Sequence, residues 1–526
     1  MKKILKLSSL VVVATLILTS CGSANDTSGD TTTDTSGDTA SGTRPITMWQ
    51  WKGNEEVLGI NTSDIEAVNI LAERTGVEID WINPSDAATE FQAIMTSGQD
   101  MPDAIMYKYT PQTMFGYAKN ARIIDLAPYL DEHLPNLKKL LAENEDLEKQ
   151  IVSEDGQILY LPWITQGKYY FEGPMMRKDW LEATGMEVPT TTDELYNVLK
   201  KQKELFDAGE LPNAGESFYG LSGYPTQTNK LIYGFNTTND FLLTEDGHVV
   251  YGPTTDEYRE AMEWYYKLST EGLLDPDLIS FDSDIYMSHH TNNLTSIYVD
   301  GYANFQEVER VNPDIEYIPV PYMTDDNGNI MEYNSTTKRI AQPYGYAISQ
   351  SAAEDEEVLA NVLKVFDYLY SDEGQELMSW GVEGETFEVV DGNKQYTDKI
   401  MADPDWSPGL AASKYLKSDL GNTDLAVNAA LVDERGRETF GMWENTDYSL
   451  AMEPTLWTTD EETEVINTYL TDIKTFKDEY EQKFQTGTLD PSDDAVWEEF
   501  QNGLKTLNVE VVTENYDAAY QRFNAR

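Results

Sequence analysis

The chain has 526 residues, of which 40% are hydrophobic and 11% aromatic, so it can bury sizeable cores and is long enough for more than one domain. Its 93 acidic residues outnumber its 37 basic ones and give a formal net charge of −56. A field of this sign repels nucleic acid, and no basic run offers a patch that could bind it, so we expect no nucleic-acid partner.

The first twenty residues have the pattern of a signal peptide. Lys2, Lys3 and Lys6 precede the apolar run 7–18, which is shorter than the ~20 residues that span a membrane. The next residues, Leu18 to Cys21, resemble the bacterial lipobox, in which the cysteine receives a diacylglycerol and becomes the new N-terminus. We therefore predict a signal peptide over 1–20, a lipid on Cys21 and a location on the outer face of the cell membrane. The alternative is an ordinary secretory signal with an incidental cysteine.

Residues 22–43 read GSANDTSGDTTTDTSGDTASGT and contain almost nothing that could be buried. Such a segment cannot offset the entropy of ordering, so residues 21–43 are predicted to be a lipidated, disordered tether. Cys21 is the only cysteine, so the folded part uses no disulfides in the oxidising setting that export implies.

The folded part begins with an alternation of strands and helices. Strands are predicted over 45–51, 77–82 and 103–107, with helices over 63–75 and 90–97 between them. Ser63 and Glu66 have the spacing of a capping box, and Gly76 supplies a C-terminal stop. This order is typical of a parallel sheet covered by helices.

The alternation continues later in the chain. Thr191 and Glu194 predict the start of a helix over 191–206, and a second helix is predicted over 354–369. Both place apolar residues on one face, which are Leu195, Val198, Leu199, Leu205 and Phe206 in the first, and Val358, Leu359, Val362, Phe366 and Leu369 in the second. The fold class is therefore α/β.

Five stretches in order resemble one family. They are GQDMPDAIM (98–106), DGQILYLP (155–162), RKDWLEATGMEVPTTTDEL (177–195), TEGLLDPD (270–277) and YSDEGQELMSWGVEGE (370–385). The chain is similar to the extracellular solute-binding proteins of family 1, the lipid-anchored receptors of bacterial ABC importers. Within that family it looks most like the long oligosaccharide-binding lipoproteins of Gram-positive bacteria.

This resemblance implies the periplasmic-binding-protein fold, with two lobes and a ligand cleft between them. By position, the first lobe takes residues 44–162 and about 340–410, where QPYGYAIS looks like a crossing strand. The second lobe takes about 163–339 and 411–526. The implied partners are a small-molecule ligand, two ABC permease subunits and the membrane, and we expect a monomer.

The ligand is predicted to be a carbohydrate, which presents apolar faces to aromatic rings and hydroxyl edges to planar polar groups. Candidate ligand contacts lie beyond predicted strand ends or at positions that the resemblance implies. They are Trp49, Trp51, Lys52, Tyr107, Lys108, Tyr109, Trp163, Tyr224, Asp300, Tyr302 and Trp443. Any of these can instead be a core residue, as helical spacing indicates for Trp264 and Trp497. The acidic composition favours a neutral oligosaccharide over a uronate, and a peptide or other non-sugar solute stays open.

No cofactor, metal or catalytic residue is predicted. Asp325, Asn327 and Asn329 have the alternate spacing of a calcium loop, but Ile330 and Thr336 occupy positions that need glycine and glutamate. A hairpin turn at Asn327-Gly328 is the better interpretation. The acidic loop of the family's calcium-binding members is reduced here to Asp207, Glu210 and Glu216, which makes calcium a minority alternative.

His289 and His290 are predicted to lie in an exposed loop. The competing class is a glycoside hydrolase with two catalytic carboxylates, which spacing alone does not exclude among so many acidic residues. The resemblance to receptors along the whole chain argues against it.

Overall fold

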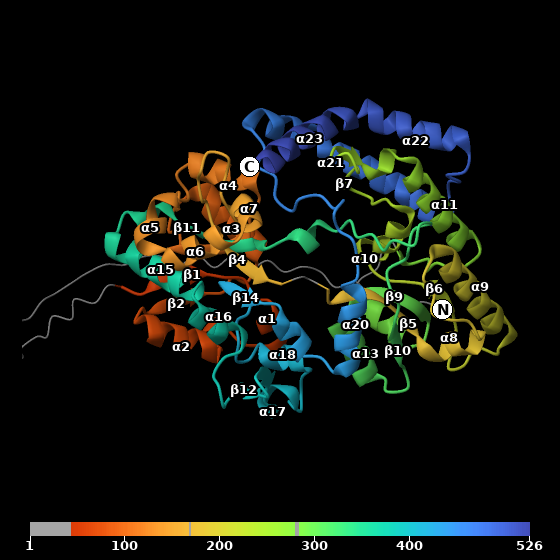
Figure 1. Cartoon of the computed structure of the whole chain (residues 1–526), viewed down its shortest axis with the longest axis horizontal. Coiled ribbons are helices and arrows are strands. Elements are labelled where there is room, and N and C mark those ends of the chain that lie inside the picture. Colours follow the sequence, from red (N-terminus) through yellow and green to blue (C-terminus); the bar gives the residue numbers. More distant parts are fainter. Residues whose placement is uncertain (1–43, 168–169, 279–282) are drawn as a thin grey trace, which may run out of the picture. The chain divides into compact units, whose positions relative to one another are not determined.

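The computed structural model describes residues 44–167, 170–278 and 283–526 (Figure 1). The predicted signal peptide, Cys21 and the tether lie outside the described residues. Residues 44–526 form one unit by their contacts, and two separate sheets organise it.

The first sheet has six strands in the order β14-β4-β11-β3-β1-β2. Their bounds are β1 Ile46–Trp49, β2 Ile79–Ile82, β3 Ala104–Lys108, β4 Leu161–Gln166, β11 Ala341–Ile348 and β14 Asn422–Asp424. β1 pairs in parallel with β2 and β3, which confirms the parallel alternation predicted for the first three strands. β11, the predicted crossing strand, is antiparallel to both β3 and β4.

Helices cover both faces of this sheet. Successive strand residues point to opposite faces, and Met48 and Trp49 accordingly belong to two different apolar clusters. The helices are α1 Asn54–Leu58, α2 Glu66–Thr75, α3 Ala87–Ser97, α4 Pro111–Lys119, α5 Leu130–His133, α6 Pro135–Glu143, α7 Glu145–Ile151, α14 Gln350–Ala353, α15 Glu356–Leu369 and α16 Asp372–Ser379. All five apolar residues predicted to line the helix that is now α15 are buried.

The capping prediction for α2 is wrong. A single 3-10 turn, Thr62–Asp64, precedes the helix, and the reciprocal capping contacts there join Asn61 to Asp64. The N-cap of α2 is Ile65, which offers no side-chain acceptor. Gly76 does end the helix in the left-handed conformation at φ 63°, as predicted.

The second sheet has four strands in the order β10-β5-β9-β6. Their bounds are β5 Glu172–Arg177, β6 Tyr219–Leu221, β9 Thr295–Gly301 and β10 Tyr317–Pro319. The surrounding helices are α8 Lys178–Thr184, α9 Thr192–Ala208, α10 Pro225–Thr228, α11 Asp256–Thr270, α12 Ser283–Thr291, α13 Tyr302–Val311 and α20 Glu434–Trp443. Met175 and Met176 of β5 again face two different clusters, so this sheet is also covered on both faces.

Three C-terminal helices, α21 Asp460–Gln485, α22 Asp494–Thr506 and α23 Val509–Ala525, pack with α11 and with the hairpin β7 Phe241–Leu243 and β8 Val249–Tyr251. Trp264 and Trp497 are buried in the apolar cluster that joins these elements, as their helical spacing predicts.

The segment 380–421 forms a small cluster of its own. It contains the hairpin β12 Phe387–Val390 and β13 Asn393–Tyr396, with α17 Asp398–Met401 and α18 Pro408–Ala412, and it packs against α19 Ala426–Ala430. β14, which follows this segment, pairs in parallel with β4 of the first sheet. The stretch that the sequence assigns to the second lobe after residue 410 therefore returns first to the first sheet.

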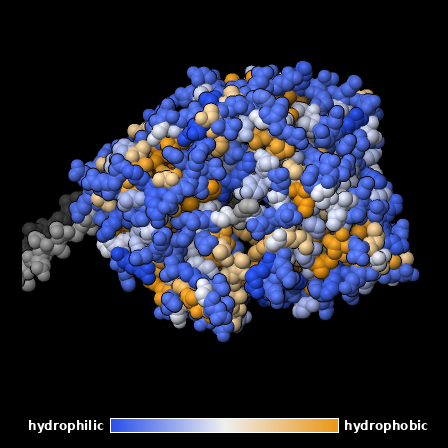
Figure 2. Space-filling view, in the orientation of Figure 1, coloured by the Kyte–Doolittle hydropathy of each residue, from blue (hydrophilic) through white to orange (hydrophobic). Residues whose placement is uncertain are grey.

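Most of the face seen in Figure 2 is hydrophilic, with hydrophobic residues in separate patches. Within the described residues, every helix is too short or too polar to cross a membrane.

Candidate functional site

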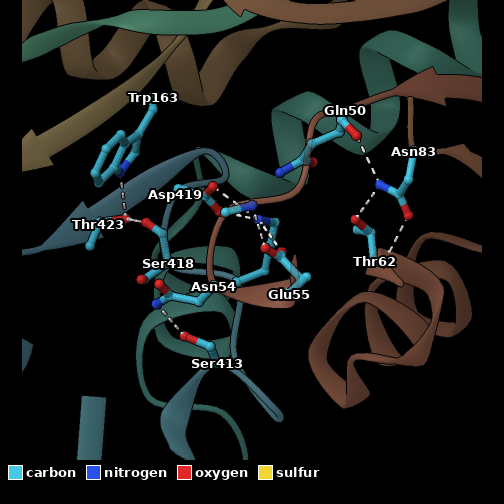
Figure 3. A network of polar contacts seen from close by, with 12 residues as sticks. Gln50, Asn54, Glu55, Thr62, Asn83, Trp163, Ser413, Ser418, Asp419 and Thr423 are labelled. Carbon is cyan, nitrogen blue, oxygen red and sulfur yellow. Dashed lines mark hydrogen bonds and ion pairs between the residues drawn. The ribbon is translucent and has the colours of Figure 1, made fainter. Parts of the chain in front are cut away.

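The chain leaves the first sheet at Gln50, and hydrogen bonds fix the loop that follows (Figure 3). Gln50 is fully buried, and its Oε1 accepts from the hydroxyl of Tyr346 on β11. Its backbone oxygen accepts from Asn83 Nδ2 at 2.8 Å, and Asn83 also contacts Thr62. These contacts hold the start of the loop that contains Trp51 and Lys52.

A buried ion cluster holds the first turn of α1, where the same loop ends. Lys417 Nζ lies 2.5 Å from Glu55 and 2.9 Å from Asp419, and Glu55 also accepts from Gly53 N at 2.8 Å. Burial alone favours neutral Glu55, but the charge and hydrogen bond of Lys417 outweigh it and keep the pKa of Glu55 below its ordinary value. Asn54, between these residues, donates to Ser413 Oγ at 2.9 Å.

Three half-buried aromatic rings gather where β1 and β3 end beside β11. The ring centroid of Trp51 lies 6.0 Å from that of Tyr107 at the end of β3 and 5.0 Å from that of Tyr344 on β11. The strand register explains this, since Tyr344 pairs with Lys108, the neighbour of Tyr107. We call Trp51, Tyr107 and Tyr344 the aromatic cluster.

Trp163 lies on β4, two strands away from β3. Its indole Nε1 donates to Thr423 Oγ1 on β14 at 3.0 Å, and the Thr423 hydroxyl in turn donates to the backbone oxygen of Ser418. The ring is half-buried, so part of its surface is open to solvent. Figure 3 shows Trp163 in the same view as Asn54 and Ser413.

The second sheet presents charged groups where β5 begins and β9 ends. Glu172 Oε2 lies 2.5 Å from Lys230 Nζ, and β5 pairs Gly173 with Asp300. Asp300 accepts from Asn304 Nδ2 at 2.8 Å and from Gly301 N at 2.7 Å. Burial raises the pKa of Asp300 despite these hydrogen bonds.

Seven of the eleven predicted contacts are at least partly exposed or lie at these strand ends. Lys52 and Tyr224 are half-buried, Lys108 is exposed, and Tyr224 stacks with Tyr286 at 6.4 Å. The set comprises Trp51, Lys52, Tyr107, Lys108, Trp163, Tyr224 and Asp300.

Trp49 and Tyr109 are core residues of the first sheet. Trp49 is 1% exposed because β1 continues through it, so its side chain belongs to a sheet face, where it packs on Phe91 at 6.3 Å. Tyr109 is 3% exposed and its hydroxyl donates to Ile105 O at 2.8 Å.

Tyr302 and Trp443 are core residues near the second sheet, and neither is exposed. The hydroxyl of Tyr302 donates to Asp433 at 2.8 Å. Trp443 Nε1 donates to Val320 O at 3.0 Å, and its ring packs on Gly173. Trp443 ends α20 rather than lying in a loop.

Sequence reasoning missed Tyr344, Glu172 and Lys230. Tyr344 had an available signal, since it lies in the predicted crossing strand. Glu172 and Lys230 are 58 residues apart, and no motif joins them.

The histidine prediction is wrong. His289 and His290 lie on α12, and both are buried. His289 Nδ1 lies 2.9 Å from Asp275 Oδ2, which also accepts from Ser222 Oγ at 2.5 Å. Asp275, Asp277 and His289 are the one cluster among the described residues whose donor atoms are close enough for a metal, and these hydrogen bonds account for the position of Asp275.

The calcium-like loop at 325 is closed by its own amides. Asp325 accepts from the backbone N–H groups of Asn327 and Asn329 at 2.9 and 2.7 Å, and from the side chain of Asn236. A turn at Asn327-Gly328 is present, with Gly328 at φ 82°. The turn joins no pair of strands among the described residues, so the hairpin is wrong.

Two sheets, each covered on both faces by helices, define the class of fold as two-lobed α/β. The chain belongs to the family of bacterial extracellular solute-binding proteins, whose model matches residues 63–376.

Two relatives are similar in sequence. The fructooligosaccharide ABC transporter substrate-binding protein FusA of Streptococcus pneumoniae serotype 4 is 29% identical over 266 residues, which are 48% of each chain. Lipoprotein LipO of Bacillus subtilis is 28% identical over 349 residues, 62% of this chain and 64% of LipO. The chain therefore matches about half the length of FusA and under two thirds of LipO.

Solved structures share the fold. The alginate-binding protein AlgQ2 without calcium ion has a TM-score of 0.71 at 20% identity, covering 91% of this chain and 99% of AlgQ2. FusA, as an EF-hand mutant in complex with fructo-nystose, has a TM-score of 0.69 at 19% identity, covering 92% and 100%.

The acidic residues that the sequence offers for calcium lie at the end of α9 and in the loop after it. Asp207 pairs with Lys203 at 2.7 Å, and among the described residues it forms no metal-binding group with Glu210 or Glu216. Asn213 instead donates to Asp179 at 3.2 Å, and Asp179 pairs with the buried guanidinium of Arg177 at 2.8 Å. A fixed cation therefore already holds this part of the structure.

Proposed function

We propose that this protein is the lipid-anchored receptor of an ABC importer, and that it captures a neutral oligosaccharide between its lobes and delivers it to two permease subunits. The observation that carries the proposal is the aromatic cluster of Trp51, Tyr107 and Tyr344 at the strand ends of the first sheet. Open α/β sheets bind ligands at such ends, and aromatic rings suit the apolar faces of sugars.

The charges near the strand ends of the second sheet favour a neutral ligand. Glu172 already pairs with Lys230, and Asp300 is held by amide donors. A uronate would bring another carboxylate toward these acids, whereas sugar hydroxyls can donate to them. A peptide is the second candidate, because hydrogen-bonding groups of this kind also suit peptide backbones.

A thermal-shift panel tests the ligand class. Neutral oligosaccharides, uronate oligomers and peptides are each added in excess to the full chain. A ligand at about 100 times its Kd, bound to the folded form alone, adds about 2.7 kcal/mol to the free energy of unfolding. A shift with neutral sugars supports the proposal, whereas a shift with peptides alone overturns the ligand class.

Capture by closure is a further part of the proposal. A ligand shifts the open and closed populations only by its different affinity for the two forms. Small-angle scattering with a saturating ligand should show compaction, and an unchanged radius of gyration would contradict closure.

The lipid on Cys21 and the monomeric state also belong to the proposal. LipO, a relative, is a lipoprotein by name. Mass spectrometry of the membrane-extracted protein should find diacylglycerol on Cys21, and an unmodified cysteine in the mature chain would overturn the anchor. Light scattering of the detergent-free soluble form should give the mass of one chain.

A further inference from the structure

We infer that a cavity between α13, α18 and the start of α1 is an additional subsite for one uncharged sugar unit, and that the ligand extends from this cavity to Trp163 and the aromatic cluster. This inference rests on the proposed function. It adds that the ligand has several sugar units and that the unit in this cavity is uncharged. The cavity has a volume of about 360 Å³, within the ~300–1,000 Å³ range of small-molecule sites.

The lining combines polar and apolar groups and is almost uncharged. Side-chain amides come from Asn54 at the start of α1, Asn304 on α13 and Asn428 on α19, and hydroxyls come from Ser413 and Ser418. Amides and hydroxyls both donate and accept, which matches the hydroxyl groups of a sugar. The apolar part of the wall, which includes Tyr396, can cover a sugar face.

The charge of the lining separates neutral from acidic sugars. Among the described residues that line the cavity, none is basic and Glu307 is the one acid. Glu307 pairs with Arg310 at 2.6 Å on its own helix. A uronate in this cavity would meet no cation and would lose its hydration without compensation.

Hydrogen bonds link the wall of the cavity to the tryptophan that the sequence predicts as a ligand contact. Trp163 donates to Thr423 at 3.0 Å, and Thr423 donates to the backbone of Ser418, which lines the cavity. Asn54 also lines the cavity, three residues after Trp51 of the aromatic cluster. One sugar ring cannot occupy both places, so the ligand must have several units.

The test is calorimetric binding of a neutral series of increasing length, with sucrose, kestose and nystose alongside the matching gluco- and manno-oligosaccharides. Two variants of the full chain alter partly exposed side chains that line the cavity, Ser407→Ala and Asn428→Ala. Asn502→Ala, on the exposed surface of α22, is the matched control. For the series that binds, we expect each cavity variant to lose about tenfold in affinity for the longest member and nothing for the disaccharide, while the control changes neither.

The outcomes separate the two proposals. Binding by the wild type with equal losses at every length, or with no loss in either variant, would overturn the subsite but leave the receptor intact. If the wild type binds no neutral member of any series, the proposed function fails and the subsite fails with it. Both variants remove partly exposed side chains, so they should fold about as stably as the wild type, and a denaturation curve of each variant shows that lost affinity does not come from unfolding.

Discussion

The ammonium group of Lys417 lies 2.5 Å from the carboxylate of Glu55, and the two side chains are only 4% and 3% exposed. This pair joins α1, which directly follows the loop of Trp51 and Lys52, to the segment that leads into β14. A charge that is buried in this way is tolerated only while its partner stays in place. The pair therefore links the stability of the fold to the geometry of the candidate site.

Lys417→Met should be strongly destabilising because it leaves Glu55 buried without its cation. The expected loss in the free energy of unfolding is about 3 to 5 kcal/mol, measured by chemical denaturation. The double variant with Glu55→Gln should recover part of this loss. As a control, Lys399→Met breaks a partly exposed pair with Glu66 at 3.1 Å and should cost about 1 kcal/mol or less. Equal losses for the two lysines would contradict a special role for the buried pair.

The pKa of Glu55 sets the sign of a pH effect. Its folded pKa is below the unfolded value of about 4.3, so its ionised form stabilises the fold above that pH. This stabilisation should be lost as the pH falls through the folded pKa. In Glu55→Gln the corresponding acid-dependent loss should be absent when denaturation is repeated from pH 6 down to pH 3.

Sequence patterns predicted local elements well and contacts poorly. The helix and strand periods fixed where α9, α15, β1 and β3 lie, because those periods depend on neighbouring residues alone. Whether an aromatic residue is buried in the core or partly exposed depends on where the strand ends. Trp49 and Trp51 are two positions apart, yet β1 includes Trp49 and ends before Trp51. The Glu172–Lys230 and Glu55–Lys417 pairs join distant segments, and only the folded topology brings them together.

Four tryptophans offer a direct test of the difference between half-buried candidate ligand contacts and core residues. Trp51→Ala and Trp163→Ala remove half-buried rings and should weaken sugar binding while leaving most of the stability intact. Trp49→Ala and Trp443→Ala empty core positions and should cost about 3 to 5 kcal/mol of unfolding free energy. Calorimetric titration and chemical denaturation on all four variants give both readouts. Unchanged affinity in both Trp51→Ala and Trp163→Ala would discard the stacking model.

Gly173→Ala should destabilise the fold about as strongly as removal of the Trp443 ring does. A Cβ atom at this position would lie 2.2 Å from the Trp443 ring, which is packed on all sides and has no room to move. We expect a large drop in Tm or an insoluble product. The double variant with Trp443→Ala removes the clash, so its stability should match that of Trp443→Ala alone. A fully stable single variant would show that the ring can shift.

Asp300→Asn should separate binding from stability. Burial raises the folded pKa of Asp300 above the unfolded value of about 3.9, so its charge opposes folding at neutral pH and this penalty fades as the pH falls. The neutral variant should therefore be at least as stable as the wild type at pH 7, with a smaller advantage at pH 4. If Asp300 accepts from the ligand, sugar affinity should fall in the same variant. Lower stability at pH 7 would contradict the raised pKa.

His290 should give the clearest dependence of stability on pH between pH 6.5 and 5, where most carboxylates contribute little. It is buried on α12 beside the hydroxyl of Tyr317, and burial lowers its pKa to about 3. The unfolded chain takes up a proton near pH 6.5 and the folded chain does not, so stability should fall as the pH drops through this range. His290→Phe should remove that part of the slope in denaturation curves at closely spaced pH values. His248→Phe, at a histidine whose side chain is 60% exposed, should leave the slope from His290 in place. A wild-type slope that survives in His290→Phe would mean that this imidazole is protonated in the folded protein.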